Sequence, residues 1–224
     1  SAAALIATGW LLLIAAGCAA LDTIAKYAVL SFEDMLTTME DNIIPDQKNN
    51  GWALTSPGGE RFVWSRDFST EGTPDLMLFF DATPFLDAGL DPAKLPVDGY
   101  RYESDTRQLH VIAELGQDPF KYAAEPNPLE SFKEIVRTHR NSIGYHAAMD
   151  HYGVEIGNGN MFEWAKDMNT NDKDIVFVLN PSPFLEAGVD ASTLAEWVYA
   201  EVETMDAGGK KQMVFKFLKP YDVK

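Results

Sequence analysis

Two short stretches, Phe62–Arg66 and Phe162–Lys166, place an aromatic pair before a basic residue with the same spacing. On a strand, alternate residues point to the same side, so Trp64 would lie beside Arg66, and Trp164 beside Lys166. An aromatic surface ending in a cation can line a pocket for an anionic or aromatic ligand. The same pattern also suits core aromatics with the cation at the strand end. We therefore treat Trp64, Arg66, Trp164 and Lys166 as candidate ligand-binding residues, with core packing as the alternative.

Four pairs of acidic residues recur in the two halves of the chain. Paired carboxylates can serve acid–base chemistry or bind calcium. Three of the pairs, however, stand where helix caps and turns favour acids, and no stretch has the alternating acids of a calcium loop. We therefore expect structural roles and no metal site. The pairs are Asp67 with Asp167, Asp75 with Asp174, Asp87 with Glu186, and Asp91 with Asp190.

The four histidines offer no obvious metal or catalytic group. His139 and His146 would be two turns apart on a continuous helix, too far to share one ion, and Gly144 is expected to end that helix between them. His110 and His151 lie elsewhere. No nucleophile-elbow, phosphate-loop, dinucleotide or zinc-protease motif is present in the sequence. The sequence therefore predicts no catalytic residue, no metal and no cofactor, and does not favour an enzyme.

The sequence elements that would position these residues occur twice in the chain. Asp75–Leu95 reads like Asp174–Leu194, and Gly59–Thr70 reads like Gly159–Thr170. A unit of this length is too long for a solenoid repeat and right for a small domain. Weaker matches extend the alignment; they pair Gly51 with Gly153, Tyr102–Ser104 with Val202–Thr204, and His110 with Met213.

Each unit reads as a helix followed by an antiparallel sheet. An amphipathic pattern with spacings of three and four residues precedes strand-like stretches with a period of two. Continuous apolar runs at Asp75–Asp81 and Asp174–Asn180 predict central strands. Each run leads into a short helix, for which the sequence predicts N-caps at Thr83 and Ser182 and stops at Gly89 and Gly188.

The sequence therefore predicts an α+β protein with a hydrophobic, transmembrane-like N-terminal helix and two tandem, internally homologous helix-plus-antiparallel-sheet domains. Proline and polar residues between the repeats read as a linker. The predicted segments are a helix at 1–25, a first unit at 26–116, a linker at 117–128 and a second unit at 129–224.

The N-terminal segment Ala2–Leu21 contains no charged residue. As a helix it would span roughly 30 Å, the thickness of a bilayer's hydrocarbon core. We favour a retained single-pass membrane or assembly helix. A signal or lipoprotein segment is an alternative, because Ala15–Cys18 is similar to a bacterial lipobox, which makes Cys18 a candidate lipidation site. A buried core helix is the third interpretation.

The chain is strongly acidic, with 34 Asp and Glu against 18 Lys and Arg and a formal charge of −16. Such a surface repels phosphate backbones, so we expect no nucleic-acid partner. Its single cysteine allows no intrachain disulfide and no cysteine-based zinc site. The acidic body is compatible with export, and we expect a membrane-anchored, extracytoplasmic location, in the periplasm or at the cell surface.

The stretch "VLNPSPFLEAGVDASTL" (Val178–Leu194) resembles a phrase of PAS domains, in which a strand runs into a short helix. Tandem helix-and-sheet units behind one membrane helix are similar in plan to Cache-type sensor domains. The resemblance covers about 17 residues in each unit, and it implies an extracytoplasmic module for small ligands. The inferred strand order departs from that family, because two strand pairs flank the short helix.

Together these features predict a non-catalytic, membrane-anchored accessory or structural subunit of a larger assembly. It would contact other protein subunits through its N-terminal helix, and a homo-oligomer is an option. One alternative is a pilin-like filament subunit, although the glutamate near the start of a pilin helix is here Leu5. The other alternative is a Cache- or PAS-like ligand-binding module.

Overall fold

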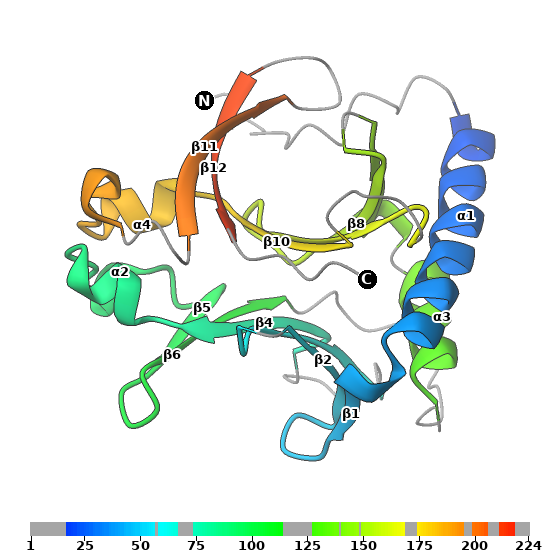
Figure 1. Ribbon diagram of the computed structural model, residues 1–224, viewed down its shortest axis with the longest axis horizontal. Helices are drawn as coiled ribbons and strands as arrows, with labels where there is room; N and C mark the ends of the chain where they lie inside the picture. Colours follow the sequence, from blue (N-terminus) through cyan, green and yellow to red (C-terminus); the bar gives the residue numbers. More distant parts are fainter. Residues whose placement is uncertain are drawn as a thin grey trace.

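The computed structural model describes residues 17–56, 58–66, 74–113, 127–138, 140–147, 149–168, 174–194, 199–205 and 211–217. These residues form an α+β fold with two antiparallel sheets, each of six strands. One sheet comes from each sequence repeat (Figure 1). The α+β prediction is therefore confirmed for the described part of the chain.

The first sheet has the strand order β1-β2-β3-β4-β6-β5, a meander whose last two strands change places. Its strands are β1 (Ile43–Asp46), β2 (Gly51–Thr55), β3 (Arg61–Ser65), β4 (Leu76–Asp81), β5 (Tyr100–Glu103) and β6 (Gln108–Ala113). The second sheet has the equivalent order β7-β8-β9-β10-β12-β11. Its strands are β7 (Ile143–His146), β8 (His151–Glu155), β9 (Met161–Ala165), β10 (Ile175–Leu179), β11 (Tyr199–Met205) and β12 (Lys211–Phe217).

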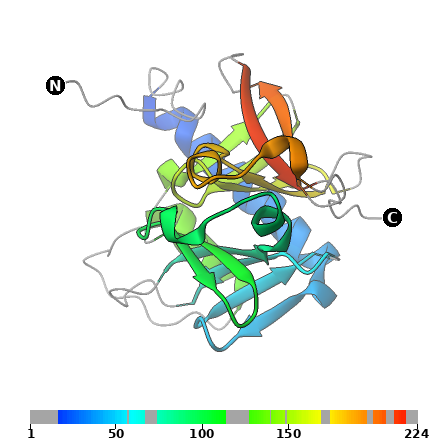
Figure 2. The same cartoon turned by 90° about the vertical axis from the view of Figure 1, so that its left-hand side faces the viewer.

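Longer helices precede each sheet, and short helices follow each central strand. Helix α1 (Gly17–Thr38) and helix α3 (Pro128–Thr138) pack together at one end of the molecule (Figure 1). Helices α2 (Thr83–Asp87) and α4 (Ser182–Glu186) lie side by side at the other end (Figures 1 and 2). Single 3-10 turns complete the pattern: η2 (Glu40–Asn42), η3 (Pro92–Lys94), η4 (Arg140–Ser142) and η5 (Ala191–Thr193).

The two sheets bend away from each other, so that each has a convex face toward its partner and a concave face away from it (Figure 1). Alternation along a strand separates the two faces. In β3, Phe62 and Trp64 belong to the central core, whereas Val63 belongs to a separate small cluster on the concave face. The second sheet has its own concave-face cluster around Val176 and Val178. The molecule thus has one core shared by both repeats and a smaller one inside each curl.

The central core is built from aromatic residues that meet their own counterparts from the other repeat. Phe32 of α1 stacks on Phe132 of α3 with ring centroids 3.6 Å apart. Phe62 stacks on Phe162 at 4.3 Å. Residues one hundred positions apart therefore face each other across an approximate twofold axis. Fully buried aromatic pairs of this kind supply large apolar areas and defined geometry.

The backbone repeats the same symmetry beside α2 and α4. The Asp91 amide donates to the Ala187 carbonyl at 2.9 Å, and the Asp190 amide donates to the Ala88 carbonyl at 2.7 Å. Gly89 and Gly188 have φ values of +101° and +103°, and a side-chain carbon on either would lie within 2.9 Å of the other's carbonyl oxygen. Both positions therefore need glycine for conformation and for close approach.

The N-terminal region differs from the prediction in its boundaries. Helix α1 begins among the described residues at Gly17 and continues without a break to Thr38, across the boundary predicted at residue 25. Residues 1–16 lie outside the described part of the chain. Among the described helices, none is both long enough and apolar enough for a bilayer crossing.

Several local predictions were wrong. Thr83 and Ser182 are the first helical residues rather than N-caps, since their amides donate to Asp81 Oδ1 and Asn180 Oδ1 at 2.9 and 3.1 Å. Side chains at the strand ends thus supply the capping oxygen. Gly144 does not end a helix, because α3 stops at Thr138 and Gly144 lies in β7.

The sequence alignment was also shifted at both ends of the repeat. Gly51 pairs with Ser65, and His151 pairs with the equivalent residue Ala165. Gly51 therefore corresponds to His151 rather than to Gly153. His110 pairs with Phe79 of β4, and the equivalent residue of β10, Val178, pairs with Lys216. The counterpart of His110 is therefore Lys216 rather than Met213. The cause of this second shift is the longer β11–β12 hairpin, whose strands each have 7 residues.

The close approach of Gly89 and Gly188 can be tested by alanine substitution, with Gly59 as a matched control. Gly59 also has a positive φ of +93°, but an added side-chain carbon there would meet no atom within 4 Å. We expect Gly59→Ala to lower the free energy of unfolding by about 1–2 kcal/mol, the cost of the left-handed backbone. Gly89→Ala should cost more, because it also forces the repeats apart. Equal losses in urea denaturation would show that the approach carries no strain.

Candidate functional site

The four candidate ligand-binding residues occupy two kinds of place. Trp64 and Trp164 are fully buried and pack edge-on against Phe32. The Trp64 indole also donates to the Pro128 carbonyl at 3.0 Å, which links the two repeats. Neither ring leaves a face to solvent, so the core interpretation describes their position. Ligand binding by these rings stays a prediction that no contact among the described residues supports.

The two basic candidates lie just beyond the ends of β3 and β9. The Arg66 guanidinium lies 5.2 Å from the centre of the Trp52 ring. Lys166 is exposed; its ammonium lies 3.8 Å from Asp150 and 5.8 Å from the Tyr145 ring centre. Both cations therefore cover aromatic rings at the edge of the convex face.

Cys18 falls in the first turn of α1, and its side chain lies outside the described part of the chain, as does Asp67. The structural roles expected for the repeated acids are confirmed at one pair. Asp91 and Asp190 cap η3 and η5 by accepting from the amides two residues later.

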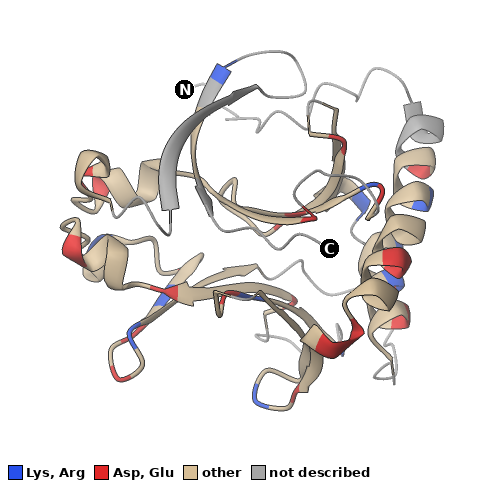
Figure 3. Ribbon diagram, viewed as in Figure 1, with Lys and Arg blue, Asp and Glu red and all other residues tan. Residues whose placement is uncertain are grey.

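The strongest cluster of ionisable groups lies on the concave face of the second sheet. Charged residues are concentrated in helices, turns and strand ends, and the central strands carry few (Figure 3). Glu163 of β9 is an exception with an exposed fraction of 1%. His146 Nδ1 lies 3.3 Å from Glu163 Oε1, and His151 Nδ1 lies 3.4 Å from Glu163 Oε2. Three adjacent strands thus hold two imidazoles against one buried carboxylate.

The imidazoles of His146 and His151 stabilise the ionised form of the Glu163 carboxylate. Burial alone would raise the pKa of Glu163, but the two histidine rings beside it outweigh burial and lower the pKa to about 2. Glu163 is therefore ionised at any physiological pH. His151 is fully buried, and neither of its ring nitrogens has a well-aligned hydrogen-bond partner among the described residues. Its attraction to Glu163 is an ion–dipole or ion-pair contact rather than a good hydrogen bond.

The first repeat has the same backbone but different chemistry at these positions. Asp46 stands where the second repeat has His146, and Val63 stands where it has Glu163. The concave face of the first sheet instead holds Arg61, which lies 3.3 Å from Asp46 and has its guanidinium 4.5 Å from the Phe79 ring centre. The fold therefore does not require the His–Glu–His cluster.

His110 is the buried histidine of the first sheet. Burial lowers its pKa to about 4, and the Glu103 carboxylate, 3.9 Å from its Nε2, only partly opposes that effect. Glu103 is shared with Lys48, whose ammonium lies 3.4 Å away. His110 is therefore a neutral ring at physiological pH. Within the described ranges, no group of His, Cys, Asp and Glu residues is arranged to hold a metal ion.

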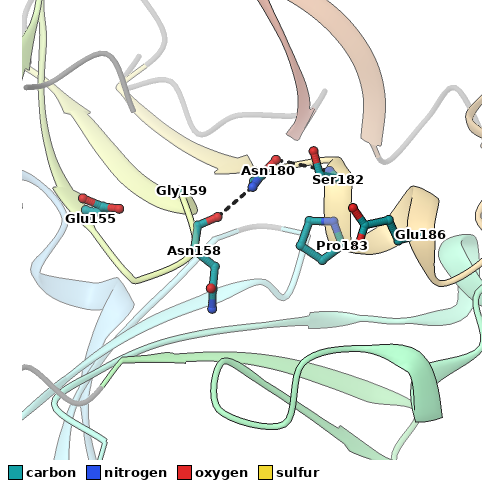
Figure 4. A pocket seen from close by; sticks show the side chains of 7 residues that line it. All are labelled: Glu155, Asn158, Gly159, Asn180, Ser182, Pro183 and Glu186. Carbon is teal, nitrogen blue, oxygen red and sulfur yellow. Dashed lines mark hydrogen bonds between the residues drawn. The ribbon is translucent and has the colours of Figure 1, made fainter. Parts of the chain in front are cut away.

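A pocket of about 350 Å³ opens at the end of the second sheet (Figure 4). One wall is the β8–β9 connection, with Glu155, Asn158 and Gly159. The other wall is the end of β10 and helix α4, with Asn180, Ser182, Pro183 and Glu186. Sequence reasoning missed Glu155 and Glu163, because both lie on strands whose pattern shows only apolar alternation. The signal that was available is the change from Thr55 to Glu155 and from Val63 to Glu163 between the repeats.

Comparison with models of protein families, with curated proteins and with solved structures found no match to this chain.

The Glu163 cluster predicts a specific acid sensitivity. Its folded-state pKa lies below the ordinary value of 4.5, so its contribution is fully present above about pH 4.5 and is lost as the pH falls toward 2. The loss should reach as much as about 3 kcal/mol of unfolding free energy. Urea denaturation from pH 5 downward should therefore show a shallower decline for Glu163→Gln than for the parent. Asp105→Asn, at an exposed turn, is the control; parallel curves for all three proteins would contradict the assignment.

His110 should titrate far from an exposed histidine. Side-chain nitrogen NMR, with His110→Gln used to assign the signal, should show its ring neutral until the pH approaches about 4. Because the folded-state pKa lies below the ordinary 6.5, the associated stability is present above pH 6.5 and is lost as the pH falls toward 4. A midpoint near 6.5 would show that the ring is hydrated.

Proposed function

We propose that this chain is a non-catalytic, membrane-anchored accessory subunit, held by its apolar N-terminal segment with the two-sheet body outside the cytoplasm. The observation that supports this proposal is the course of α1. The helix leaves the uncharged segment and continues into the body without a hinge, from Gly17 to Thr38. A rigid connection of this kind suits a subunit that must hold its body in a fixed orientation.

Helix α1 is fastened to both repeats along its described length. Asp22 forms an ion pair with Arg140 of the second repeat. Further along, the Ser31 hydroxyl donates to the Ala165 carbonyl at 2.9 Å, and Phe32 enters the shared aromatic core. Through these contacts of α1, a force on the N-terminal segment would act on the central core and not on a flexible connection.

The outward face of α1 leaves apolar side chains uncovered. Tyr27 and Leu30 are one turn apart and are 52% and 47% exposed. A turn of helix that is apolar on its outer side is a natural contact for another subunit. This pair therefore supports the expected partner class, other protein subunits bound through the N-terminal helix.

The anchor can be tested by comparing the full chain with a chain that lacks residues 1–16. We expect the full chain in the membrane fraction after a salt wash, and the shortened chain in the supernatant with an unchanged melting temperature. Protease treatment of sealed vesicles should reveal on which side the body lies. Membrane association that survives the deletion would refute anchoring by this segment.

The partner contact requires its own test. Native mass spectrometry of the purified assembly should show Tyr27→Ala/Leu30→Ala losing partner subunits that the parent retains. Val97→Ala is the matched control, because Val97 is an 89% exposed apolar residue on a distant loop. Fibres of the purified chain under negative stain would instead favour the filament alternative.

A small-ligand-binding module remains the second candidate, because the second repeat has a pocket with polar walls. This candidate and the accessory role are compatible, since the pocket and the N-terminal helix lie at opposite ends of the body (Figure 1).

A further inference from the structure

The two repeats differ in how a helix covers the outer strands of the sheet. Helix α1 has 22 described residues and α3 has 11. Because Phe132 of α3 is the counterpart of Phe32, the first residue of α3, Pro128, corresponds to Ala28. The part of α1 before Ala28 therefore has no counterpart in α3. Helix α1 packs against β7, β8 and β9, whereas α3 packs against β3 of the first sheet (Figure 1).

This difference leaves apolar residues of β1 and β2 more exposed than their equivalents. In the second repeat, Ile143 and Tyr152 are only 4% and 5% exposed. Their counterparts Ile43 and Trp52 are half-buried, and Pro45, which pairs with Trp52, is exposed. We call Ile43, Pro45 and Trp52 the β1–β2 surface. A helix lies over the equivalent place in the second repeat, so the fold itself shows that a helix fits this surface.

Helix α3 does not supply this cover by running further back along the chain. The Asn127 side chain accepts from the Glu130 amide at 2.9 Å, which caps the helix. Pro128 is the first helical residue, and the residue before a proline is disfavoured in the helical conformation. The helix of the first repeat therefore stops short of the β1–β2 surface, which is open to a helix of another chain.

The outer face of α1 is a helical surface with uncovered apolar side chains. Tyr27 and Leu30 lie between Lys26, on the side of the helix start, and Glu33 and Asp34, on the side of the helix end, and all five are exposed. Asp34 follows Lys26 by eight positions, a span of about 12 Å along a helix. This face therefore presents a base, an apolar pair and two acids in that order.

The β1–β2 surface has the complementary order of charges. Glu40 and Asp41 are exposed and precede β1. At the other end of the surface, the Arg66 guanidinium lies 5.2 Å from the centre of the Trp52 ring. Pro45 follows Asp41 by four positions, which in extended chain is roughly 13 Å. The two surfaces therefore match in length, and each end of one can meet the opposite charge on the other.

We infer that α1 of one copy of this chain packs its outer face on the β1–β2 surface of a second copy. Tyr27 and Leu30 cover Trp52, the two acids of α1 face Arg66, and Lys26 faces the acids before β1. Because the two surfaces differ, the contact is heterologous, and its repetition links copies into a ring or an open chain. This inference rests on the proposed role of α1 as the subunit contact, and it names a second copy as the subunit.

The test uses complementary variants of the full chain in detergent, measured by native mass spectrometry over a range of concentrations. The parent should form species larger than a monomer. Tyr27→Ala/Leu30→Ala removes one surface, and Pro45→Glu places an acid on the other, so each variant alone should be monomeric. An equimolar mixture should form a dimer with one copy of each variant, because each retains the surface that the other has lost.

Ile44→Glu is the matched control for Pro45→Glu. Ile44 is 52% exposed on the same strand, but it pairs with Ala53 of the concave-face cluster and so points to the opposite face. This variant should associate like the parent. Equal loss of association in Ile44→Glu and Pro45→Glu, or a mixture of the complementary variants that stays monomeric, would overturn the inference.

Charge reversal tests the predicted orientation of the contact. Arg66→Glu should weaken association about tenfold or more, since it sets an acid against the acids of α1. Adding Asp34→Arg to the same chain should restore most of the loss, and an absence of any restoration would refute this orientation.

The accessory role and the choice of a second copy fail in different ways. A parent chain that stays monomeric at all concentrations would overturn the self-association. So would an assembly in which Tyr27→Ala/Leu30→Ala releases a different protein and Pro45→Glu releases nothing, but that result would leave the accessory role intact. If neither variant changes the assembly or the association of copies, the role of α1 as a subunit contact is itself wrong.

Discussion

The structure depends on contacts between equivalent aromatic residues of the two repeats, which meet across the approximate twofold axis. Phe32 on Phe132 and Phe62 on Phe162 are stacked, and both members of each pair are fully buried. A self-complementary contact tolerates few changes, because each residue must fit a near copy of itself. This requirement explains why the two repeats keep the same aromatic residues at the same spacing. It also makes one core out of two sequence units, because among the described residues the convex faces of both sheets contribute to the same buried cluster.

The concave faces are free of that requirement, and they have diverged. Where the first repeat has Asp46 and Val63, the second has His146 and Glu163. The strand pairing at these positions is the same in both repeats, so the differences cannot be attributed to the needs of the fold. Each sheet has a small apolar cluster inside its curl, and each places a different set of ionisable groups beside it. Chemistry that belongs to one repeat alone is therefore found on the concave faces and the loop ends.

The two ends of the body also have different properties. At one end, α1 and α3 form a fully packed aromatic contact that ties the N-terminal helix to both repeats. At the other end, α2 and α4 are short helices capped by the strand-end side chains Asp81 and Asn180, and the pocket opens beside α4. The aromatic contact and the pocket therefore lie on opposite sides of the body (Figure 1).

The sequence by itself determined the duplication, the α+β class, the central strands and the glycine stops after the short helices, because each follows from local periodicity or backbone conformation. It also indicated that Asp91 and Asp190 would cap turns. Only the tertiary structure decided that Trp64 and Trp164 lie in a shared core, because strand alternation shows which residues share a face but not what covers that face. The His146–Glu163–His151 cluster was likewise invisible, since its members come from three strands and meet only through the register of the sheet. Glu155 and Glu186 are 31 residues apart, and their shared pocket depends on how α4 folds back over the end of β10.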